Sequence, residues 1–264
     1  MKLGFIGTGT ITTAVVTGLY STDEYKKQIL ISPRNWSRAN ILKKKFSGIS
    51  IAKDNQEIVN NCDLIILAVR PQVAQQVLRP LEFKVNQKIL SFIATLPAKD
   101  LANLIKPASD IIQAVPLPTV AQRLGPIAVY PPDIEVTKLM SKIGSVIEVK
   151  NNESFLALWS VTALMAPYFA FLASTSEWLI KNNTNKQDAS KYIAEMFKSL
   201  SILGASIEPA DFDSLAKKHQ TAGGLNEQAV RELYQDDWYI AIDKTLDRIL
   251  SRLEGKYVYS PKDS

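Results

Sequence analysis

Two short glycine segments carry the residue types best suited to binding and chemistry. The first, GTG at residues 7–9, ends an apolar run and precedes a stretch with helical spacing. Gly7 permits a tight turn out of a strand, and Gly9 lets a phosphate approach the amides of Thr10 and Ile11 at the helix start. This arrangement is typical of a site for a dinucleotide pyrophosphate.

Alone the glycine pair is a weak signal, because such pairs end many strands that bind nothing. Its place after the first strand and at the start of the first helix strengthens it. Thr12 stands where a third glycine is usual. We expect this threonine to widen the packing of helix against strand and to leave the phosphate-facing positions unchanged.

The end of the second strand indicates which dinucleotide would bind. Ser32-Pro33-Arg34 stands where an NAD site places an Asp or Glu for the ribose hydroxyl. A hydroxyl and a guanidinium suit a 2′-phosphate, so the pattern favours NADP(H). The alternative is that Arg34 and Arg38 are only exposed side chains at a helix start.

The second segment, TAGGLN at residues 221–226, predicts a sharp turn before a helix. We expect Asn226 to cap a helix that starts at Glu227, with Gly223 and Gly224 freeing the backbone to turn. Amides at a helix start attract anions, which makes the loop a candidate cradle for a substrate carboxylate. The alternative is a plain turn between two helices.

Around these segments, β-branched runs alternate with helical stretches up to residue 150. This pattern predicts an α/β fold with a doubly wound parallel sheet, that is, a Rossmann domain over residues 1–150. The runs lie at residues 3–7, 28–32, 63–69, 88–94, 110–115, 126–131 and 145–149. Long amphipathic stretches follow, including one from Asn226 to Leu253, and predict an all-helical domain over residues 151–264.

Composition narrows the function classes. The chain has 264 residues, 46% of them apolar and 22% charged, with a net charge of +5. We expect a soluble cytoplasmic protein that binds no nucleic acid, with the apolar stretch 155–180 as a buried helix because polar residues and Pro167 interrupt it. One cysteine and one histidine leave no disulfide and no zinc site. Cys62 is predicted to lie in the core and His219 to cap a helix C-terminus.

These motifs, in this order, resemble the pyrroline-5-carboxylate reductase family. The resemblance spans nearly the whole chain. It rests on GFIGTGTIT at 4–12, Asn55, the AVRPQ phrase at 68–72, the proline-rich turn at 115–119, VTAL at 161–164 and TAGGLN at 221–226.

The resemblance implies reduction of a C=N bond in a cyclic imino acid by NADPH, in a homodimer built through the helical domain. No metal is implied. It carries cofactor contacts onto Asn55, Ala68, Val69, Arg70 and Pro71. In the second loop it assigns Thr221 to the substrate carboxylate and Asn226 to the imine nitrogen.

Departures from the family pattern point to a modified pocket. Met165 and Leu225 replace small or hydroxylated residues that meet the substrate in the family, so the imine is pyrroline-5-carboxylate or a related ring. A second hypothesis follows from the same substitutions, namely an NADP-binding dimeric regulator without turnover. The absence of lysine and glycine between Phe155 and Ile180 argues against a hydroxyacid dehydrogenase.

Overall fold

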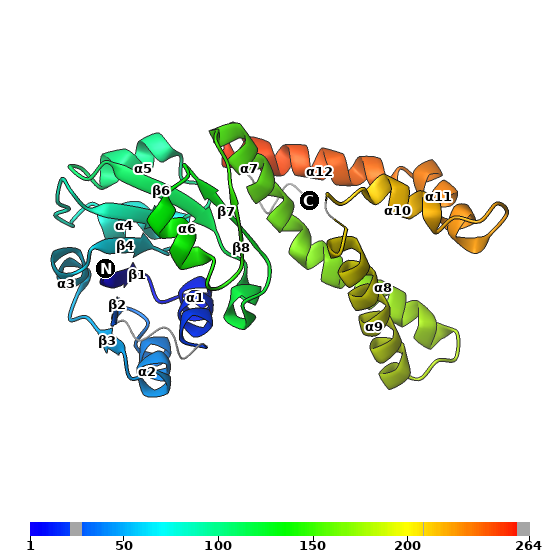
Figure 1. Ribbon diagram of the computed structural model, residues 1–264, viewed down its shortest axis with the longest axis horizontal. Coiled ribbons are helices and arrows are strands. Elements are labelled where there is room, and N and C mark those ends of the chain that lie inside the picture. Colours follow the sequence, from blue (N-terminus) through cyan, green and yellow to red (C-terminus); the bar gives the residue numbers. More distant parts are fainter. Residues whose placement is uncertain (22–27, 208, 258–264) are drawn as a thin grey trace. The chain divides into compact units, whose positions relative to one another are not determined.

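The chain divides into two compact units, which we describe from a computed structural model (Figure 1). The structure describes residues 1–21, 28–207 and 209–257. The first unit comprises Met1–Ser160 and Ile249–Ser264, and the second comprises Val161–Arg248. The domain border expected at residue 150 stays a prediction. It was defined by function, with one domain for the cofactor and one for dimerisation, whereas the two units are defined only by contacts within one chain.

The first unit is built on an eight-stranded sheet of order β3-β2-β1-β4-β5-β6-β7-β8. The strands are β1 (Leu3–Ile6), β2 (Ile29–Ile31), β3 (Ile49–Ile51), β4 (Leu64–Leu67), β5 (Lys88–Ser91), β6 (Asp110–Val115), β7 (Pro126–Tyr130) and β8 (Ser145–Glu148). This topology confirms the predicted doubly wound α/β fold, with the strand order reversing at β1 and β4.

Two features of the sheet differ from the sequence prediction. Strand β3 was missed, because three residues with a serine at their centre give too short a pattern to recognise. Strands β6 and β7 pair antiparallel rather than parallel. Only residues 116–125 join them, and a parallel crossover needs a dozen residues or more.

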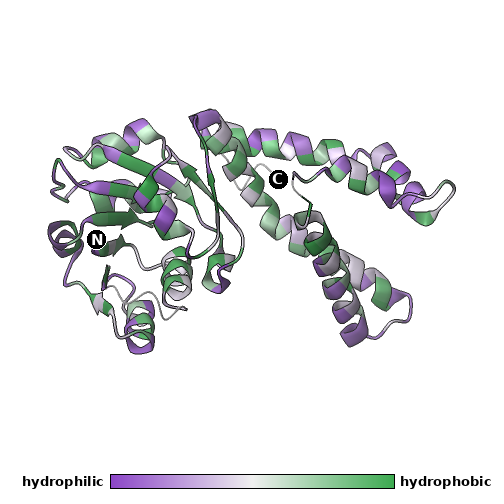
Figure 2. Ribbon diagram, viewed as in Figure 1, coloured by the Kyte–Doolittle hydropathy of each residue, from purple (hydrophilic) through white to green (hydrophobic). Residues whose placement is uncertain are grey.

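Helices cover both faces of this sheet. Along β4, Leu64 and Ile66 face one apolar cluster while Ile65 and Leu67 face the other, as alternation along a strand requires. In Figure 2 the strands of the sheet are mostly green, that is hydrophobic, with some hydrophilic stretches. The first cluster includes residues of α1 (Thr10–Tyr20), α2 (Trp36–Lys45), η1 (Pro118–Gln122) and α6 (Ile134–Met140), and the second those of α3 (Asn55–Asn61), α4 (Pro71–Leu78) and α5 (Ala98–Leu104).

The remaining elements are helical. They are α7 (Asn152–Val161), η2 (Thr162–Leu164), α8 (Met165–Lys181), α9 (Lys186–Ala205), α10 (Phe212–Lys218), α11 (Leu225–Gln235) and α12 (Trp238–Leu253). The stretch predicted from Asn226 to Leu253 is two helices, because Asp237 takes a left-handed conformation (φ +55°) between them.

The predicted burial of residues 155–180 is wrong for the single chain. Only 17% of the most apolar window of the continuous helix Asn152–Lys181 is buried, and no residue of α8 is. Its length and composition alone would allow it to cross a membrane, which for one helix is weak evidence. Periodicity identified an apolar helix but not what covers it.

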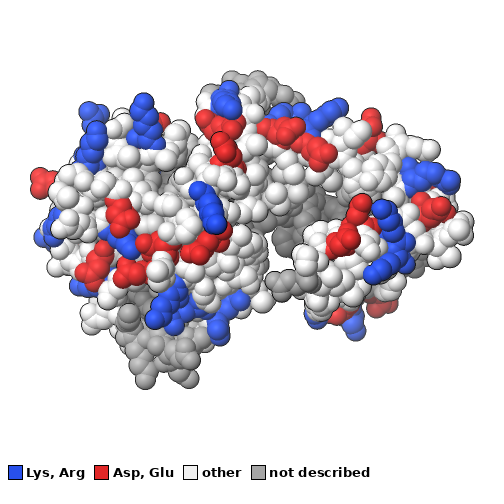
Figure 3. Space-filling view, turned by 45° about the horizontal axis from the view of Figure 1, so that its top comes forward, with Lys and Arg blue, Asp and Glu red and all other residues white. Residues whose placement is uncertain are grey.

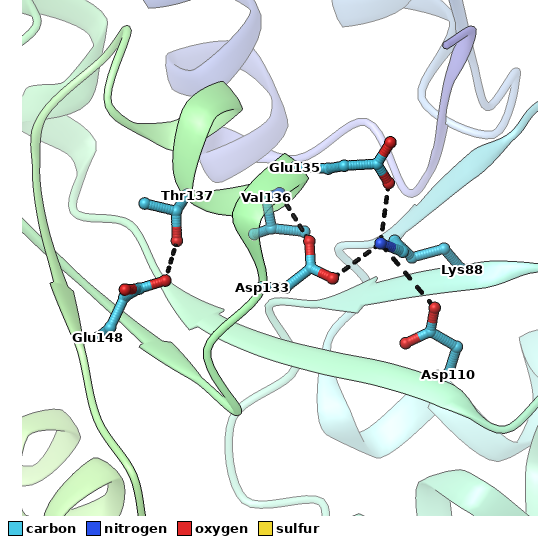
Figure 4. A network of polar contacts seen from close by, with 7 residues as sticks. All are labelled: Lys88, Asp110, Asp133, Glu135, Val136, Thr137 and Glu148. Carbon is cyan, nitrogen blue, oxygen red and sulfur yellow. Dashed lines mark hydrogen bonds and ion pairs between the residues drawn. The ribbon is translucent and has the colours of Figure 1, made fainter.

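A network of charged side chains lies at the amino edge of the sheet (Figure 4). Lys88 Nζ, at the start of β5, lies 2.7 Å from Asp133 Oδ2 and 2.8 Å from Glu135 Oε2. Asp133 also caps α6 by accepting from Val136 N–H. Burial opposes the charged form of Asp133, yet the hydrogen bonds from Lys88 and Val136 lower its pKa overall. On the face of the molecule shown in Figure 3, acidic and basic side chains are interspersed.

We predict that Asp133→Asn, which keeps a capping oxygen but loses the charge, lowers the free energy of unfolding by about 1–2 kcal/mol at pH 7. A carboxyl with a lowered folded pKa stabilises above its unfolded pKa of about 4, and this contribution is lost as pH falls through the folded value. The free energies of unfolding of wild type and variant, measured by urea melts, should therefore converge as the pH falls below the lowered folded pKa of Asp133.

Asp213→Asn is the matched control, because Asp213 is 88% exposed where it meets Lys217. It should change stability little at any pH. A gap between wild type and Asp133→Asn that persists unchanged at low pH would contradict the assignment.

Candidate functional site

The turn after β1 brings the ends of β1 and β4 into close contact. Gly7 has φ +104°, and a Cβ added there would lie 2.5 Å from the carbonyl oxygen of Ala68 and 3.0 Å from a methyl group of Val69. No other residue type fits this backbone and this spacing. The structure therefore brings Gly7, Ala68 and Val69 together at the carboxyl edge, where the strand order reverses.

Threonines fix this turn. The Thr12 hydroxyl donates to the Gly7 carbonyl at 2.6 Å, and the buried Thr8 hydroxyl donates to the Ser32 carbonyl at 2.7 Å. The sequence predicted Thr12 as a spacer only, whereas it also closes the turn. Thr8 was missed altogether, because nothing in its spacing reveals a partner 24 residues away.

Helix α1 begins at the turn with its first amides uncapped by any side chain. Its N-cap is Gly9, which has no side-chain hydrogen bond and around which an added Cβ would meet nothing within 4 Å. Thr10 and Ile11 follow as the first two helical residues. Amides at such a helix start favour an anion, so the cradle fits a pyrophosphate.

The residues predicted for the ribose end separate into buried and exposed groups. Ser32 is 1% exposed, and its hydroxyl donates to Asn55 Oδ1 at 2.7 Å. Arg34 is exposed beyond β2. Arg38 lies on α2, and its guanidinium donates to the Thr10 hydroxyl at 3.0 Å. This bond places a cation beside the start of α1, which the sequence alone could not establish.

The phrase after β4 forms the opposite side of the edge. Arg70 is the exposed N-cap of α4, Pro71 is its first residue, and no side chain caps this helix either. Asn55 begins α3, which Asp54 caps. The predicted cofactor residues thus follow β1, β2, β3 and β4 in neighbouring positions of one sheet edge.

The second glycine segment lies in the other unit, in the turn between α10 and α11. Gly223 has φ +70°, with nothing within 4 Å of an added Cβ. Gly224 N–H donates to the Thr221 carbonyl at 2.7 Å, and Gly223 N–H donates to Glu227 Oε2 at 2.6 Å. The loop is therefore folded by its own backbone and by one carboxylate three residues into the helix.

The expected capping role of Asn226 is wrong. Gly224 is the N-cap of α11, and Asn226 is its second residue, with its side-chain amide donating to the His219 carbonyl at 3.0 Å. The Gly223 N–H donates to Glu227 Oε2, and the helix starts two residues earlier than predicted, at Leu225 rather than Glu227. Leu225, the first helical residue, is 85% exposed, and Met165 at the start of α8 is 40% exposed.

Two minor predictions are confirmed. His219 is the C-cap of α10, with its Nδ1 2.8 Å from the Leu215 carbonyl. Cys62 is buried, and burial raises the pKa of its thiol to about 11, which leaves no thiolate for chemistry near neutral pH. Among the described residues, no three His, Cys, Asp or Glu side chains gather as a metal site.

Comparisons with known proteins agree with this geometry. The family described as "NADP oxidoreductase coenzyme F420-dependent" matches residues 2–95. The pyrroline-5-carboxylate reductase of Vibrio alginolyticus is 23% identical over 96% of this chain and 96% of its own length. The chain is a divergent relative of the pyrroline-5-carboxylate reductases. These matches point to an NAD(P)-dependent oxidoreductase.

Solved structures of pyrroline-5-carboxylate reductases share the fold. That from Streptococcus pyogenes covers 95% of this chain, and 98% of its own chain is matched, with a TM-score of 0.79 and 23% identity. The structure from Plasmodium falciparum, which has NADP bound, matches 97% of this chain and 98% of its own chain. Its TM-score is 0.82 and its sequence identity 16%.

We predict that alanine substitutions at the two glycines of the first turn affect different properties, stability at Gly7 and cofactor binding at Gly9. Gly7→Ala should lower the free energy of unfolding by about 2 kcal/mol or more, since it combines a left-handed backbone with a backbone clash. Gly9→Ala should change stability by less than about 1 kcal/mol, because φ is −93° and the space around it is open.

For Gly9→Ala the loss should appear in binding. Its methyl group would occupy the space where phosphates reach the amides, so NADPH affinity measured by titration calorimetry should fall at least tenfold. Unchanged NADPH affinity in Gly9→Ala would show that the cofactor lies elsewhere.

Proposed function

We propose that the protein reduces the C=N bond of a small cyclic imino acid with NADPH. The observation that carries this proposal is the presence of two uncapped helix starts with glycine turns, one at Gly9 and one at Gly224. The first suits a pyrophosphate and the second suits a carboxylate. A dinucleotide reductase acting on an anionic substrate needs one site of each kind.

The choice of NADP(H) over NAD(H) rests on charge at the ribose end. Arg34 and Arg38 follow β2, Arg38 is held at the start of α1 by Thr10, and no acidic residue stands at 32–38 to bind a ribose hydroxyl. Ser32 contributes through Asn55 as a buried support rather than as an exposed ligand.

The second loop supplies the substrate contacts in this proposal. The amide of Leu225, with the Thr221 hydroxyl, would hold the carboxylate, while Gly223 and Gly224 shape the turn around it; the Gly224 amide itself is bonded to the Thr221 carbonyl. Asn226 has two amide protons, and its bond to the His219 carbonyl uses one and leaves the other to donate to the imine nitrogen. The bound dinucleotide supplies the hydride. Orienting the ring is the main contribution of these residues, because an iminium needs no strong acid.

The competing hypothesis, a cofactor-binding regulator without turnover, has one observation in its favour. Leu225 presents a bulky side chain, 85% exposed, at the loop that would meet the substrate. Such a protein would bind NADPH and oxidise none of it, so the same assay separates the two functions.

We predict that purified protein oxidises NADPH, and NADH more slowly, with five- or six-membered cyclic imino acids. Asn226→Ala should lower kcat/KM about 10–100-fold by removing the donor to the imine nitrogen, and the rate of NADPH absorbance loss measures it. Arg34→Ala should lower the ratio of kcat/KM with NADPH to kcat/KM with NADH, because it removes a cation from the proposed 2′-phosphate site.

Asn61→Ala serves as the matched control. This asparagine also donates to a backbone carbonyl, that of Glu57, but it lies at the end of α3 opposite to Asn55 and belongs to neither glycine loop. Its kcat/KM should equal that of wild type. The proposal fails if no cyclic imine is reduced, or if Asn61→Ala and Asn226→Ala lose activity equally.

We also propose that the protein is a soluble, cytoplasmic homodimer formed through the predicted domain 151–264. Large apolar side chains are exposed across the helices, with Phe169 at 67%, Trp178 at 62%, Tyr192 at 65% and Phe212 at 70%. Exposed apolar area on this scale is typical of a surface covered by a partner. A second copy would also bury the apolar helix 152–181.

We predict a solution mass of twice the 29.3 kDa chain by light scattering. Phe169→Glu should shift it towards the monomer, because a charge would be buried in the interface. Ile134→Glu, at an apolar side chain 86% exposed on α6, should leave the dimer intact. A wild-type monomer, or recovery of the protein with membranes, would contradict the proposal.

A further inference from the structure

A cavity of about 290 Å³ lies within the first unit, and no residue of the glycine turn lines it. It is lined by Ile93 and residues 95–98 after β5, by β6 and β7, by α7, and by the last residue of α12 with Glu254 after it. Neither the cofactor cradle nor the substrate loop includes these residues. The volume exceeds that of a single water several times over.

A buried glutamine faces this cavity without a hydrogen-bond partner. Gln113 on β6 is 6% exposed and lines the cavity, and its side-chain amide makes no hydrogen bond to any described residue. A buried carboxamide without partners destabilises a fold, so native proteins rarely keep one.

A second buried glutamine shows the usual arrangement. Gln87 is also 6% exposed, but its amide nitrogen donates to the Val59 carbonyl and its oxygen accepts from Lys84 N–H at 2.8 Å. Both ends of that carboxamide are satisfied within the chain. The contrast indicates that the partner of Gln113 comes from outside the protein.

The cavity walls define the shape of that partner. Tyr130 and Trp159 both line it, and each packs against Phe155, with ring centroids 5.8 and 5.3 Å apart. Leu156 and Leu253 add aliphatic surface. Flat rings suit such walls, because aromatic side chains pack against planar groups with little loss of conformational freedom.

The cavity lining offers no free charge for an ionic ligand. Among the lining residues, all of them described, Glu254 carries the only carboxylate, and Lys256 pairs with it at 2.9 Å. A charged ligand would lose its hydration without gaining an opposite charge. Gln113 instead offers a neutral donor beside a neutral acceptor, which is complementary to a C=O next to an N–H.

We propose that this cavity is a binding site for a small uncharged ring amide, such as a five- or six-membered lactam, held by paired hydrogen bonds to Gln113. The site is separate from the proposed reductase function, and either can fail without the other. A carboxamide also occurs in the nicotinamide of the dinucleotide, so the experiment distinguishes a free amide from the cofactor.

The test uses 2-pyrrolidone as the probe, with saturation-transfer NMR on the full-length protein. We expect saturable binding with a Kd on the order of 1 mM, as for other ligands of a few atoms. N-methyl-2-pyrrolidone, which keeps the carbonyl but lacks the N–H, should bind at least tenfold more weakly. Saturating NADPH should leave the affinity for 2-pyrrolidone unchanged.

Two glutamine variants complete the test. Gln113→Met should reduce 2-pyrrolidone affinity at least tenfold while leaving the Tm of the free protein unchanged or raised, because it removes an unpaired polar group. Gln87→Met should keep the affinity and lower the Tm by about 3 °C or more, because it removes two hydrogen bonds.

The proposal is overturned if 2-pyrrolidone does not bind saturably, if NADPH displaces it, or if both pyrrolidones bind equally. It is also overturned if Gln113→Met binds 2-pyrrolidone as wild type does. A Tm loss in Gln113→Met as large as that in Gln87→Met would show that water already satisfies Gln113, and would overturn it as well.

Discussion

The close approach of the β1 turn to the end of β4 is the constraint on which the proposed cofactor site depends. With Gly7 at φ +104° and the Ala68 carbonyl 2.5 Å from where a Cβ would stand, the chain turns sharply enough for α1 to begin at once. The first amides of α1 then emerge between the two strands at which the sheet reverses. Any side chain at this position would push β1 and β4 apart at the edge that holds the site.

Hydroxyl groups maintain this arrangement without occupying the site. Thr12 ties the start of α1 back to the Gly7 carbonyl, and Thr8 with Ser32 and Asn55 links the ends of β1, β2 and β3. These bonds satisfy buried polar groups, as a close-packed edge requires. The helix amides at Gly9 remain uncapped, so the same turn is rigid and yet open to an anion.

The two units differ in how much of their apolar surface the chain itself covers. The sheet of the first unit is enclosed by helices on both faces, and its charges at the amino edge are neutralised by pairing. The second unit leaves large aromatic side chains exposed. Gln113 is a similar case inside the first unit. Its buried carboxamide has no partner among the described residues, so, like an exposed apolar face, it implies a partner beyond the single chain.

The sequence by itself indicated the alternation of strands and helices apart from β3, the glycine turn, and the resemblance to the pyrroline-5-carboxylate reductases, because period, turn residues and short motifs are local properties. It also placed His219 and Cys62 correctly. Tertiary structure alone decided the antiparallel β6–β7 pair, the roles of Thr8 and Thr12, and the N-cap of α11 at Gly224 rather than at Asn226. Each of these depends on a hydrogen bond or a chain length between segments, which residue spacing alone does not reveal. Periodicity records which face of an element is apolar; only the packed structure shows whether anything covers that face.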